Sequence, residues 1–189
     1  ILCADVKNLY PSIPTQFGVN AIRTILTEFQ ISEVDFLVDL LIWVLNNNYL
    51  SFNDQIYLQI SGTAMGTPCA PTYANIVLYY MERELVSQFS PILYQRFLDD
   101  LFVIMANPPQ AESFATNFNN ILTDIQLDAI TIGNSGVFLD ILYEIENHMI
   151  TTKLYQKPSN KYLYLPPTSS HKRHILDNFI INEIHRYNL

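Results

Sequence analysis

One stretch decides the fold of this chain: residues 94–104, YQRFLDDLFVI. Two apolar segments flank two adjacent acids, a pattern that predicts a β-hairpin with Asp99 and Asp100 at its tip. A second apolar run, residues 1–6 (ILCADV), predicts a buried strand that ends near a third acid, Asp5. Carboxylates at the ends of buried strands are costly to leave unpaired, because burial disfavours the charged form and neighbouring like charges repel.

Divalent cations are the usual partners of such carboxylates. Mg²⁺ binds through one or two carboxylates together with the phosphates of a substrate. Two Mg²⁺ ions held between Asp5 and Asp99, with Mn²⁺ as the alternative metal, would suit in-line displacement at a phosphate. The competing interpretation is a solvated turn and an unrelated acid at the end of a strand.

Length and composition are typical of one large domain. The chain has 189 residues, 49% of them apolar, which is enough for a sizeable core. It begins with Ile inside a predicted core strand, so we expect a fragment of a longer protein. No apolar run approaches a membrane span, and Cys3 and Cys69 form neither a metal-ligand spacing nor a disulfide framework. We therefore expect an intracellular, nuclear protein without a membrane partner, and leave its oligomeric state open.

Charge divides the chain at about residue 150. Residues 1–150 hold 4 Lys/Arg and 16 Asp/Glu, whereas residues 151–189 hold 6 and 2. The net charge of −8 argues against a protein that coats nucleic acid by charge alone. An acidic metal-binding body with a basic C-terminal segment fits an enzyme that grips a nucleic-acid backbone locally. An ordinary acidic domain with a polar tail would have the same charge pattern.

Two helices are expected between the first strand and residue 48. Thr15 is expected to cap a helix that runs to about residue 29. Ser32 with Asp35 resembles a capping box, which would open the second helix. The apolar stripe of that second helix is expected to lie in the core, and it consists of Phe36, Leu40, Trp43 and Val44.

The remaining elements are hairpins and helices in alternation. We expect a hairpin over 49–60 that turns at Asn53-Asp54, helices over 71–87 and 108–124, strands over 137–145 and 149–155 that meet at Asn147-His148, and a helix over 171–187. Strands and helices mixed with several hairpins predict the α+β class, with an antiparallel sheet and helices packed on one of its faces.

Taken together, three motifs resemble the palm of reverse transcriptases. They are DVKNLY at 5–10, GTAMGTP at 62–68 and FLDD at 97–100, and the resemblance covers essentially the whole chain. The chain is most similar to Penelope-like retroelements: AMGTP at 64–68 is close to their AMGSP, FLD at 138–140 matches their FLD, and TKLYQKP at 152–158 resembles their TxVYRKP. Tyr162-Leu163 and residues 169–171 are also similar to that family.

This resemblance implies an RNA-directed DNA polymerase that uses an RNA template, a DNA primer and deoxynucleoside triphosphates. Residues 1–150 would be the palm core, and the basic segment 151–189 would lead toward a thumb. Asp5 and Asp99 would hold two Mg²⁺ ions that activate the primer 3′-hydroxyl and neutralise the departing pyrophosphate. Asp100 would support them, and the backbone carbonyl of Val6 would be a further metal ligand.

Tyr10 matches the position that excludes ribonucleotides in the family. A bulky ring under the sugar would clash with the 2′-hydroxyl that distinguishes RNA from DNA. The alternative for Tyr10 is a core aromatic residue before a proline turn.

The middle motif has two glycines and a proline at a predicted helix start. Such residues let the backbone approach a flat ligand and present free N–H groups. The resemblance implies contact with the nascent base pair through Ala64, Met65, Gly66 and Pro68. A simple strand-to-helix connection is the alternative. Gly62-Thr63 stands where Gln-Gly is usual in reverse transcriptases, a departure that Penelope-like sequences share.

The last third of the chain carries the expected contacts to nucleic acid. Phe138 and Leu139 resemble the element that positions the primer end, with a plain core hairpin as the alternative. The basic tail interleaves cations with rings, which suits a template–primer duplex or, alternatively, a solubilising face. Its members are Lys153, Lys157, Lys161, Lys172, Arg173 and Arg186, with Tyr155, Tyr162 and Tyr164. His171 and His174 lack further ligands nearby in the sequence, so we do not expect them to bind zinc.

Two departures from the family pattern affect the catalytic motifs. Phe97 replaces the Tyr most common before the paired acids, which preserves packing. The stretch after Leu127 lacks the lysine that polymerases often use to protonate pyrophosphate, and Lys153 and Lys157 are the candidates to replace it.

Other function classes stay open beside the main one. A decayed or domesticated reverse transcriptase would bind nucleic acid without polymerising, which the intact Asp5, Asp99 and Asp100 argue against. An RNA-copying RNA polymerase usually has Gly before its paired acids and no ring at the Tyr10 position. A telomerase-like role is a closer alternative, because a palm alone does not exclude it.

Overall fold

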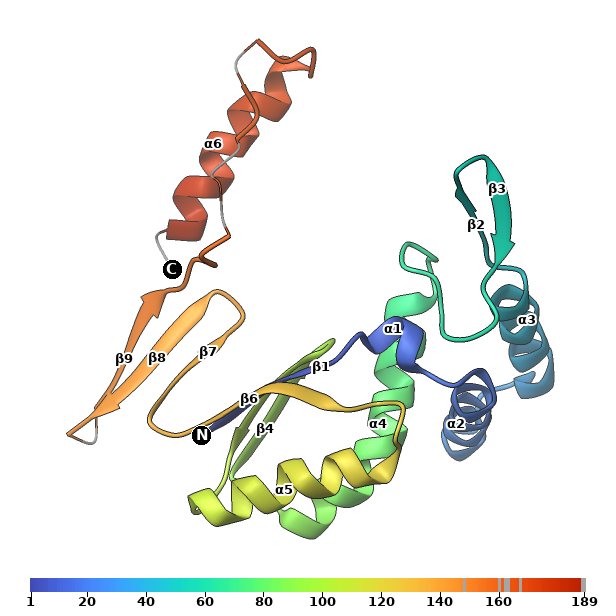
Figure 1. Ribbon diagram of the computed structural model, residues 1–189, viewed down its shortest axis with the longest axis horizontal. Coiled ribbons are helices and arrows are strands. Elements are labelled where there is room, and N and C mark those ends of the chain that lie inside the picture. The colour runs from blue at the N-terminus through green and yellow to red at the C-terminus, as the bar shows by residue number, and fades with distance from the viewer. Residues whose placement is uncertain (148, 160, 162–163, 167, 188–189) are drawn as a thin grey trace.

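A four-stranded antiparallel sheet in the order β4-β5-β1-β6 forms the centre of the computed structural model (Figure 1). The structure describes residues 1–147, 149–159, 161, 164–166 and 168–187. The strands are β1 (Leu2–Val6), β4 (Leu93–Phe97), β5 (Asp100–Ile104) and β6 (Leu127–Ile132). Helices α4 (Ala70–Phe89) and α5 (Pro108–Ile121) cover one face of the sheet. The predicted α+β class with helices on one face is confirmed.

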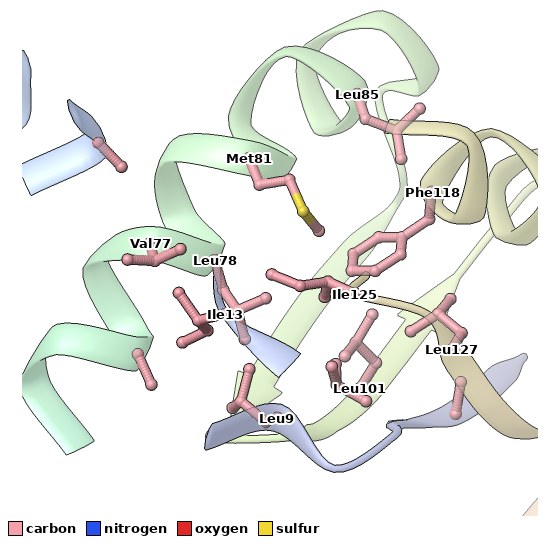
Figure 2. Packing of buried hydrophobic residues seen from close by; sticks show 14 of the residues in the cluster. Leu9, Ile13, Val77, Leu78, Met81, Leu85, Leu101, Phe118, Ile125 and Leu127 are labelled. Carbon is pink, nitrogen blue, oxygen red and sulfur yellow. The ribbon is translucent and has the colours of Figure 1, made fainter. Parts of the chain in front are cut away.

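The core lies between this sheet and the two helices. Leu101 and Val103 alternate with less buried residues along β5, so both point into the helix layer. Figure 2 shows Leu101 close to Ile125 and Phe118, with Met81 of α4 above them and Leu78 of α4 to their left. Burying one such side chain stabilises the fold by about 1.5–3 kcal/mol, so this layer fixes where the strand ends lie.

Helix starts differ in how well the sequence predicted them. Helix α5 begins as expected, because the Asn107 side chain accepts a hydrogen bond of 3.0 Å from the Gln110 amide. Helix α2 (Thr15–Glu28) has Thr15 inside its first turn and Pro14 at the cap, so the predicted Thr15 cap is wrong. The predicted capping box is wrong as well. Helix α3 (Val34–Asn46) follows Glu33, whose φ of 60° is left-handed instead of the extended backbone of a side-chain cap.

The predicted core stripe of α3 is wrong for three of its four residues, and the fourth, Val44, is half-buried. Phe36, Leu40 and Trp43 are 62%, 49% and 64% exposed, whereas Val38 and Leu45 are buried. Helix α3 packs against α2, so only the side of α3 that faces α2 reaches the core. Periodicity identified an apolar face, but it carried no information about whether another element covers that face.

The predicted hairpin after α3 is confirmed. Strands β2 (Tyr49–Phe52) and β3 (Gln55–Leu58) pair in antiparallel register. Asn53 and Asp54 both have positive φ, as a two-residue type I′ turn requires. All side chains of both strands are exposed, so the hairpin extends the apolar surface of α3 (Figure 1).

A separate three-stranded sheet follows β6. It contains β7 (Ser135–Phe138), β8 (Ile141–Glu146) and β9 (Met149–Leu154). The single strand predicted over 137–145 is wrong, because Leu139 with φ 55° turns the chain between β7 and β8. The expected turn residue His148 lies outside the described residues, and β6 was not predicted at all.

The shortest and the last helices complete the fold. Helix α1 (Leu9–Ser12) follows β1 directly, and α6 (Arg173–Tyr187) stands apart from the central sheet in Figure 1. Within the described part of the chain, none of the helices combines the length and apolar character that crossing a bilayer requires.

Candidate active site at one end of the central sheet

Three aspartates form one row across neighbouring strands. Asp5 on β1 lies opposite Asp100 on β5 and, on its other side, opposite Asp128 on β6. Directly opposed residues of antiparallel strands carry their side chains on the same face, with Cβ atoms about 4.5–5.5 Å apart. These three carboxylates therefore share one face at one end of the sheet.

Asp99 lies beside this row in the turn between β4 and β5. Its backbone carbonyl accepts a hydrogen bond of 2.8 Å from the amide of Val6, which ties the turn to the end of β1. Leu98, just before it, has a left-handed φ of 54°. The structure thus brings the predicted residues Asp5, Val6, Asp99 and Asp100 together.

The electrostatics reflect this crowding. Burial raises the pKa of Asp5, and the charges of Asp99 and Asp100 raise it further. Asp128 adds to the rise, while the cation of Lys157 opposes it. Burial and the charge of Asp99 raise the pKa of Asp100, again against Lys157. Repulsion among neighbouring carboxylates is a cost that a bound cation relieves.

Asp128 is the member of the row that the sequence analysis missed. The β1–β6 register shifts between Cys3 and Asp5, and Ala129 at this bulge has φ 47°. The Asp128 carboxylate accepts a hydrogen bond of 2.8 Å from the Ala129 amide, which stabilises the bulge. Bulges beside active sites commonly redirect side chains. An acid near one end of an apolar run was the available signal: Asp128 lies at the start of such a run, as Asp5 lies at the end of another.

The donor chemistry of the site suits a divalent cation. Carboxylates of Asp5, Asp99 and Asp100 and the carbonyl of Val6 offer oxygen only, which hard cations prefer. In the described ranges, however, no three His, Cys, Asp or Glu side chains are grouped closely enough to hold a metal ion. The residues fit the chemistry of Mg²⁺, and their side chains do not form a closed ligand set.

A cavity of ≈ 450 Å³ opens beside the carboxylates. Asp5 and Asp100 line one part of it, and Phe138 and Leu142 of the β7–β8 hairpin line another. The Phe138 ring packs against Phe102, with 5.2 Å between ring centroids. The structure therefore places Phe138 at the site, while Leu139 lies in the exposed turn beyond it.

The first and second motifs meet through their backbones. Tyr10, half-buried on α1, accepts a hydrogen bond of 2.9 Å from the Thr63 amide through its backbone carbonyl. A Cβ atom on Gly62 would lie 2.5 Å from Pro11 Cα and 2.7 Å from the Tyr10 carbonyl oxygen. Gly62 also has φ 73°, so glycine is required there on both counts.

The rest of the middle motif forms a loop that leads into α4. Met65 is 76% exposed, and Gly66 has φ 94° with open space around it. The Thr67 amide closes a turn onto the Ala64 carbonyl at 3.2 Å, and Pro68 is exposed. The loop is accessible to a ligand. Cys69, the residue before α4, makes no capping hydrogen bond through its side chain.

The basic tail divides into residues near the site and residues away from it. Lys153 on β9 pairs with Glu144 on β8 at 2.8 Å. Lys157 is the lysine whose charge reaches Asp5 and Asp100. The structure thus distinguishes Lys157 from Lys153, the two lysines that the sequence analysis suggested as replacements for the missing proton donor.

Three other cations of the tail, Lys161, Lys172 and Arg173, are exposed. Lys161 precedes the last helix, and Lys172 and Arg173 lie at its start, away from the central sheet in Figure 1. Tyr162 and Leu163 lie outside the described residues, as does the side chain of Arg186. The structure does not bring Lys161, Lys172 and Arg173 to the carboxylates.

Comparisons with known proteins identify the fold and the family. The chain matches no curated protein. It is similar to the solved structure of apo telomerase from Candida tropicalis truncated from the C-terminal domain, with a TM-score of 0.59 and 13% identity. The match covers 80% of this chain and 35% of the telomerase chain, and at this identity it shows the fold alone.

The family comparison is more specific. Residues 1–129 match the model of one family, described as reverse transcriptase (RNA-dependent DNA polymerase). The matched range contains Asp5, Asp99 and Asp100 and covers well over half of the chain. The chain therefore belongs to the reverse transcriptase (RNA-dependent DNA polymerase) family.

Proposed function

We propose that this chain is the palm of an active RNA-directed DNA polymerase, with residues 1–150 as the palm core. The observation that carries the proposal is the register of Asp5 opposite Asp100, with Asp99 in the adjoining turn. Three carboxylates at one sheet end, in a member of this family, suit nucleotidyl transfer with two divalent cations, Mg²⁺ or Mn²⁺. The substrates would be deoxynucleoside triphosphates, with an RNA template and a DNA primer.

Each residue of the site has a proposed task. Asp5, Asp99 and the Val6 carbonyl would hold the cations, and Asp100 would support them. When bound, the cations would activate the primer 3′-hydroxyl and neutralise charge on the departing pyrophosphate. The chain itself provides a fixed turn, tied to β1 through the Val6 amide, that keeps the carboxylates in place.

The surrounding residues would position the nucleic acid and the nucleotide. We assign the sugar contact to Tyr10 and the base-pair contact to Ala64, Met65, Gly66 and Pro68. Phe138 and Leu139 would hold the primer end, because Phe138 lines the same cavity as Asp5. Phosphate contacts are assigned to Lys157, Lys161, Lys172 and Arg173. Lys153 would join them on release from Glu144.

A Penelope-like retroelement is the source we propose, on the motifs at 64–68, 138–140 and 152–158. Such an element would act inside the cell, in the nucleus, with the basic segment 151–189 leading toward a thumb. A telomerase-like role is the second candidate, because the similar solved structure is a telomerase. That similarity supports a shared fold, so the two candidate functions are distinguished by the RNA template that the enzyme copies.

Primer extension by the complete reading frame tests the proposal. The purified protein is given Mg²⁺, deoxynucleotides and a DNA primer annealed to an RNA template of arbitrary sequence. Extension to the template end supports the retroelement polymerase. Extension that requires a co-purified RNA and adds a short repeat supports the telomerase-like role. Duplex binding without extension at any Mg²⁺ or Mn²⁺ concentration identifies a decayed enzyme and rejects the proposal.

A further inference from the structure

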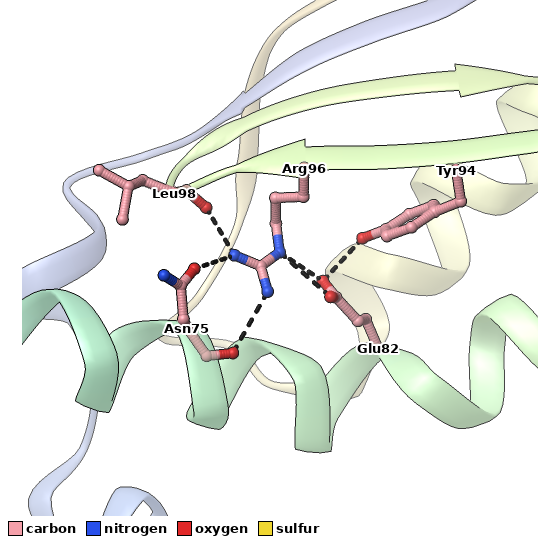
Figure 3. A network of polar contacts seen from close by, with 5 residues as sticks. All are labelled: Asn75, Glu82, Tyr94, Arg96 and Leu98. Atoms are coloured by element: carbon pink, nitrogen blue, oxygen red, sulfur yellow. Dashed lines mark hydrogen bonds and ion pairs between the residues drawn. The ribbon is translucent and has the colours of Figure 1, made fainter.

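A buried ion pair connects the strand before the catalytic turn to helix α4. Arg96 on β4 and Glu82 on α4 have side chains that are only 9% and 6% exposed. The Arg96 Nε donates to both carboxylate oxygens of Glu82 at 3.1 Å, and the Tyr94 hydroxyl donates to the same carboxylate at 2.7 Å. Figure 3 shows these contacts between the sheet and the helix.

The other end of the Arg96 guanidinium reaches the turn. Its Nη1 donates to the Leu98 backbone carbonyl at 2.9 Å and to the Asn75 side-chain oxygen at 2.6 Å. Its Nη2 donates to the Asn75 backbone carbonyl at 3.2 Å (Figure 3). The planar fork of arginine suits this simultaneous binding of several acceptors, which a lysine ammonium does not reproduce.

The anchored carbonyl belongs to a strained residue. Leu98 has φ 54°, a left-handed backbone conformation that residues with a Cβ atom rarely adopt. Such a conformation persists only where the surrounding structure holds it. Arg96 holds the Leu98 carbonyl on one side, and the Val6 amide holds the Asp99 carbonyl on the other at 2.8 Å. The turn that carries Asp99 is thus fixed from two directions.

We infer that Arg96 is a positioning residue that sets the carboxylates of Asp99 and Asp100 against Asp5 through its hold on the Leu98 carbonyl. The inference rests on the proposed function, since it concerns the same metal-dependent site. Stability alone does not account for the ion pair, because apolar residues of similar volume often replace a buried pair without loss. Apolar residues could not donate to the Leu98 carbonyl.

Two variants test the inference in the protein expressed from its complete reading frame. Arg96→Lys keeps a positive charge beside Glu82 but loses the fork. The triple variant Tyr94→Phe/Glu82→Leu/Arg96→Met replaces the network with apolar groups, so that no buried charge is left unpaired and the fold is retained. Arg83→Lys is the matched control, because Arg83 lies beside Glu82 on α4 and pairs with Glu28 in a more exposed position than the Arg96–Glu82 pair.

Two measurements are made well below the melting temperature of each variant. The first is the Mg²⁺ concentration that gives half-maximal primer extension, together with kcat and the KM for deoxynucleotide at saturating Mg²⁺. The second is the hydrogen-exchange rate of the Val6 amide in the metal-free protein. We expect both Arg96 variants to need about 10- to 100-fold more Mg²⁺, as for other residues that orient metal ligands, and to exchange Val6 faster. Arg83→Lys should change neither value.

The outcomes separate this inference from the proposed function. A folded triple variant with the wild-type Mg²⁺ requirement and Val6 protection overturns the positioning role. A lowered melting temperature without either change assigns Arg96 to stability alone and also overturns it. If the wild type shows no extension, the proposed function fails, and the Val6 exchange rates still decide whether Arg96 holds the turn.

Discussion

Asp5 and Asp100 lie directly opposite each other on β1 and β5, at the end of the sheet where the β4–β5 turn meets β1. Their pairing places two carboxylates on one face, and the charge of Asp100 contributes to the raised pKa of Asp5. Two like charges in such a position destabilise the metal-free fold, a cost that a bound cation would relieve.

Asp99→Asn should abolish Mg²⁺-dependent DNA synthesis while the protein stays folded. Loss of a metal ligand removes stabilisation of the transition state that is worth several kcal/mol, so the rate should fall by about a hundredfold or more. The measurement is primer extension on an RNA template beside a circular dichroism melt. Asp124→Asn, an exposed acid after α5, is the control and should keep its rate. Near wild-type synthesis by Asp99→Asn would reject the role of Asp99.

Asp100→Asn should stabilise the metal-free protein at neutral pH. The pKa of Asp100 in the folded protein is raised above 3.8, its ordinary value, which we take for the unfolded chain. Between the unfolded and the folded pKa, the folded state binds more protons than the unfolded state. The free energy of unfolding therefore falls as pH rises through this range. The melting temperature of the variant should therefore exceed that of the wild type at neutral pH, with the gain lost below pH 3.8. Adding Mg²⁺ should stabilise the wild type more than the variant. An equal Mg²⁺ response in both would exclude Asp100 from the metal site.

Tyr10→Ala should let the enzyme accept ribonucleotides, because removal of the ring leaves space for a 2′-hydroxyl. Where ribonucleotides are excluded by a steric clash, removing the clash is enough to admit them, and no new hydrogen-bond partner is needed. We expect the ratio of kcat/KM values for matched deoxy- and ribonucleotides to fall by about tenfold or more, which corresponds to about 1.4 kcal/mol. Tyr10→Phe keeps the ring and should keep the ratio. An unchanged ratio in active Tyr10→Ala would leave Tyr10 with a packing role only.

Gly62→Ala should destabilise the protein by more than Gly66→Ala. Both glycines have positive φ, so alanine is strained at either position, by about 1–3 kcal/mol. Only at Gly62 does the added Cβ also meet backbone atoms, those of Pro11 and Tyr10. Urea unfolding of both variants measures the loss in free energy of unfolding. The steric effect should appear as the larger loss for Gly62→Ala. Equal losses would mean that α1 moves away from the loop without cost.

The sequence predicted the parts of the fold that depend on local pattern. The β4–β5 hairpin, the Asn53-Asp54 turn and the start of α5 at Pro108 each follow from residues that lie next to one another. The strand break at Leu139 escaped prediction, because leucine carries no turn preference. Strand β6 escaped it because the bulge at Ala129 disturbs the alternation of apolar residues.

The site was predictable to the extent that its residues stand in family motifs. Asp5, Asp99 and Asp100 were predicted from acids at strand ends and from these motifs, and the structure places Asp5 opposite Asp100 with Asp99 in the adjoining turn. The role of Tyr10 stays a prediction. The Arg96–Glu82 pair was not predicted, since its members are separated along the chain and meet only when α4 packs on the sheet. Contacts of this kind depend on the tertiary fold and leave no periodic pattern in the sequence.

The exposed apolar surface of α3 and the β2–β3 hairpin has a practical consequence for colloidal behaviour. Phe36, Trp43 and Ile56 present aromatic and aliphatic groups to water on adjoining elements. Exposed apolar side chains favour self-association and precipitation where they gather into patches. The apparent molar mass of the purified chain in light scattering should therefore rise with protein concentration, and Trp43→Lys should raise the soluble yield without changing the carboxylates.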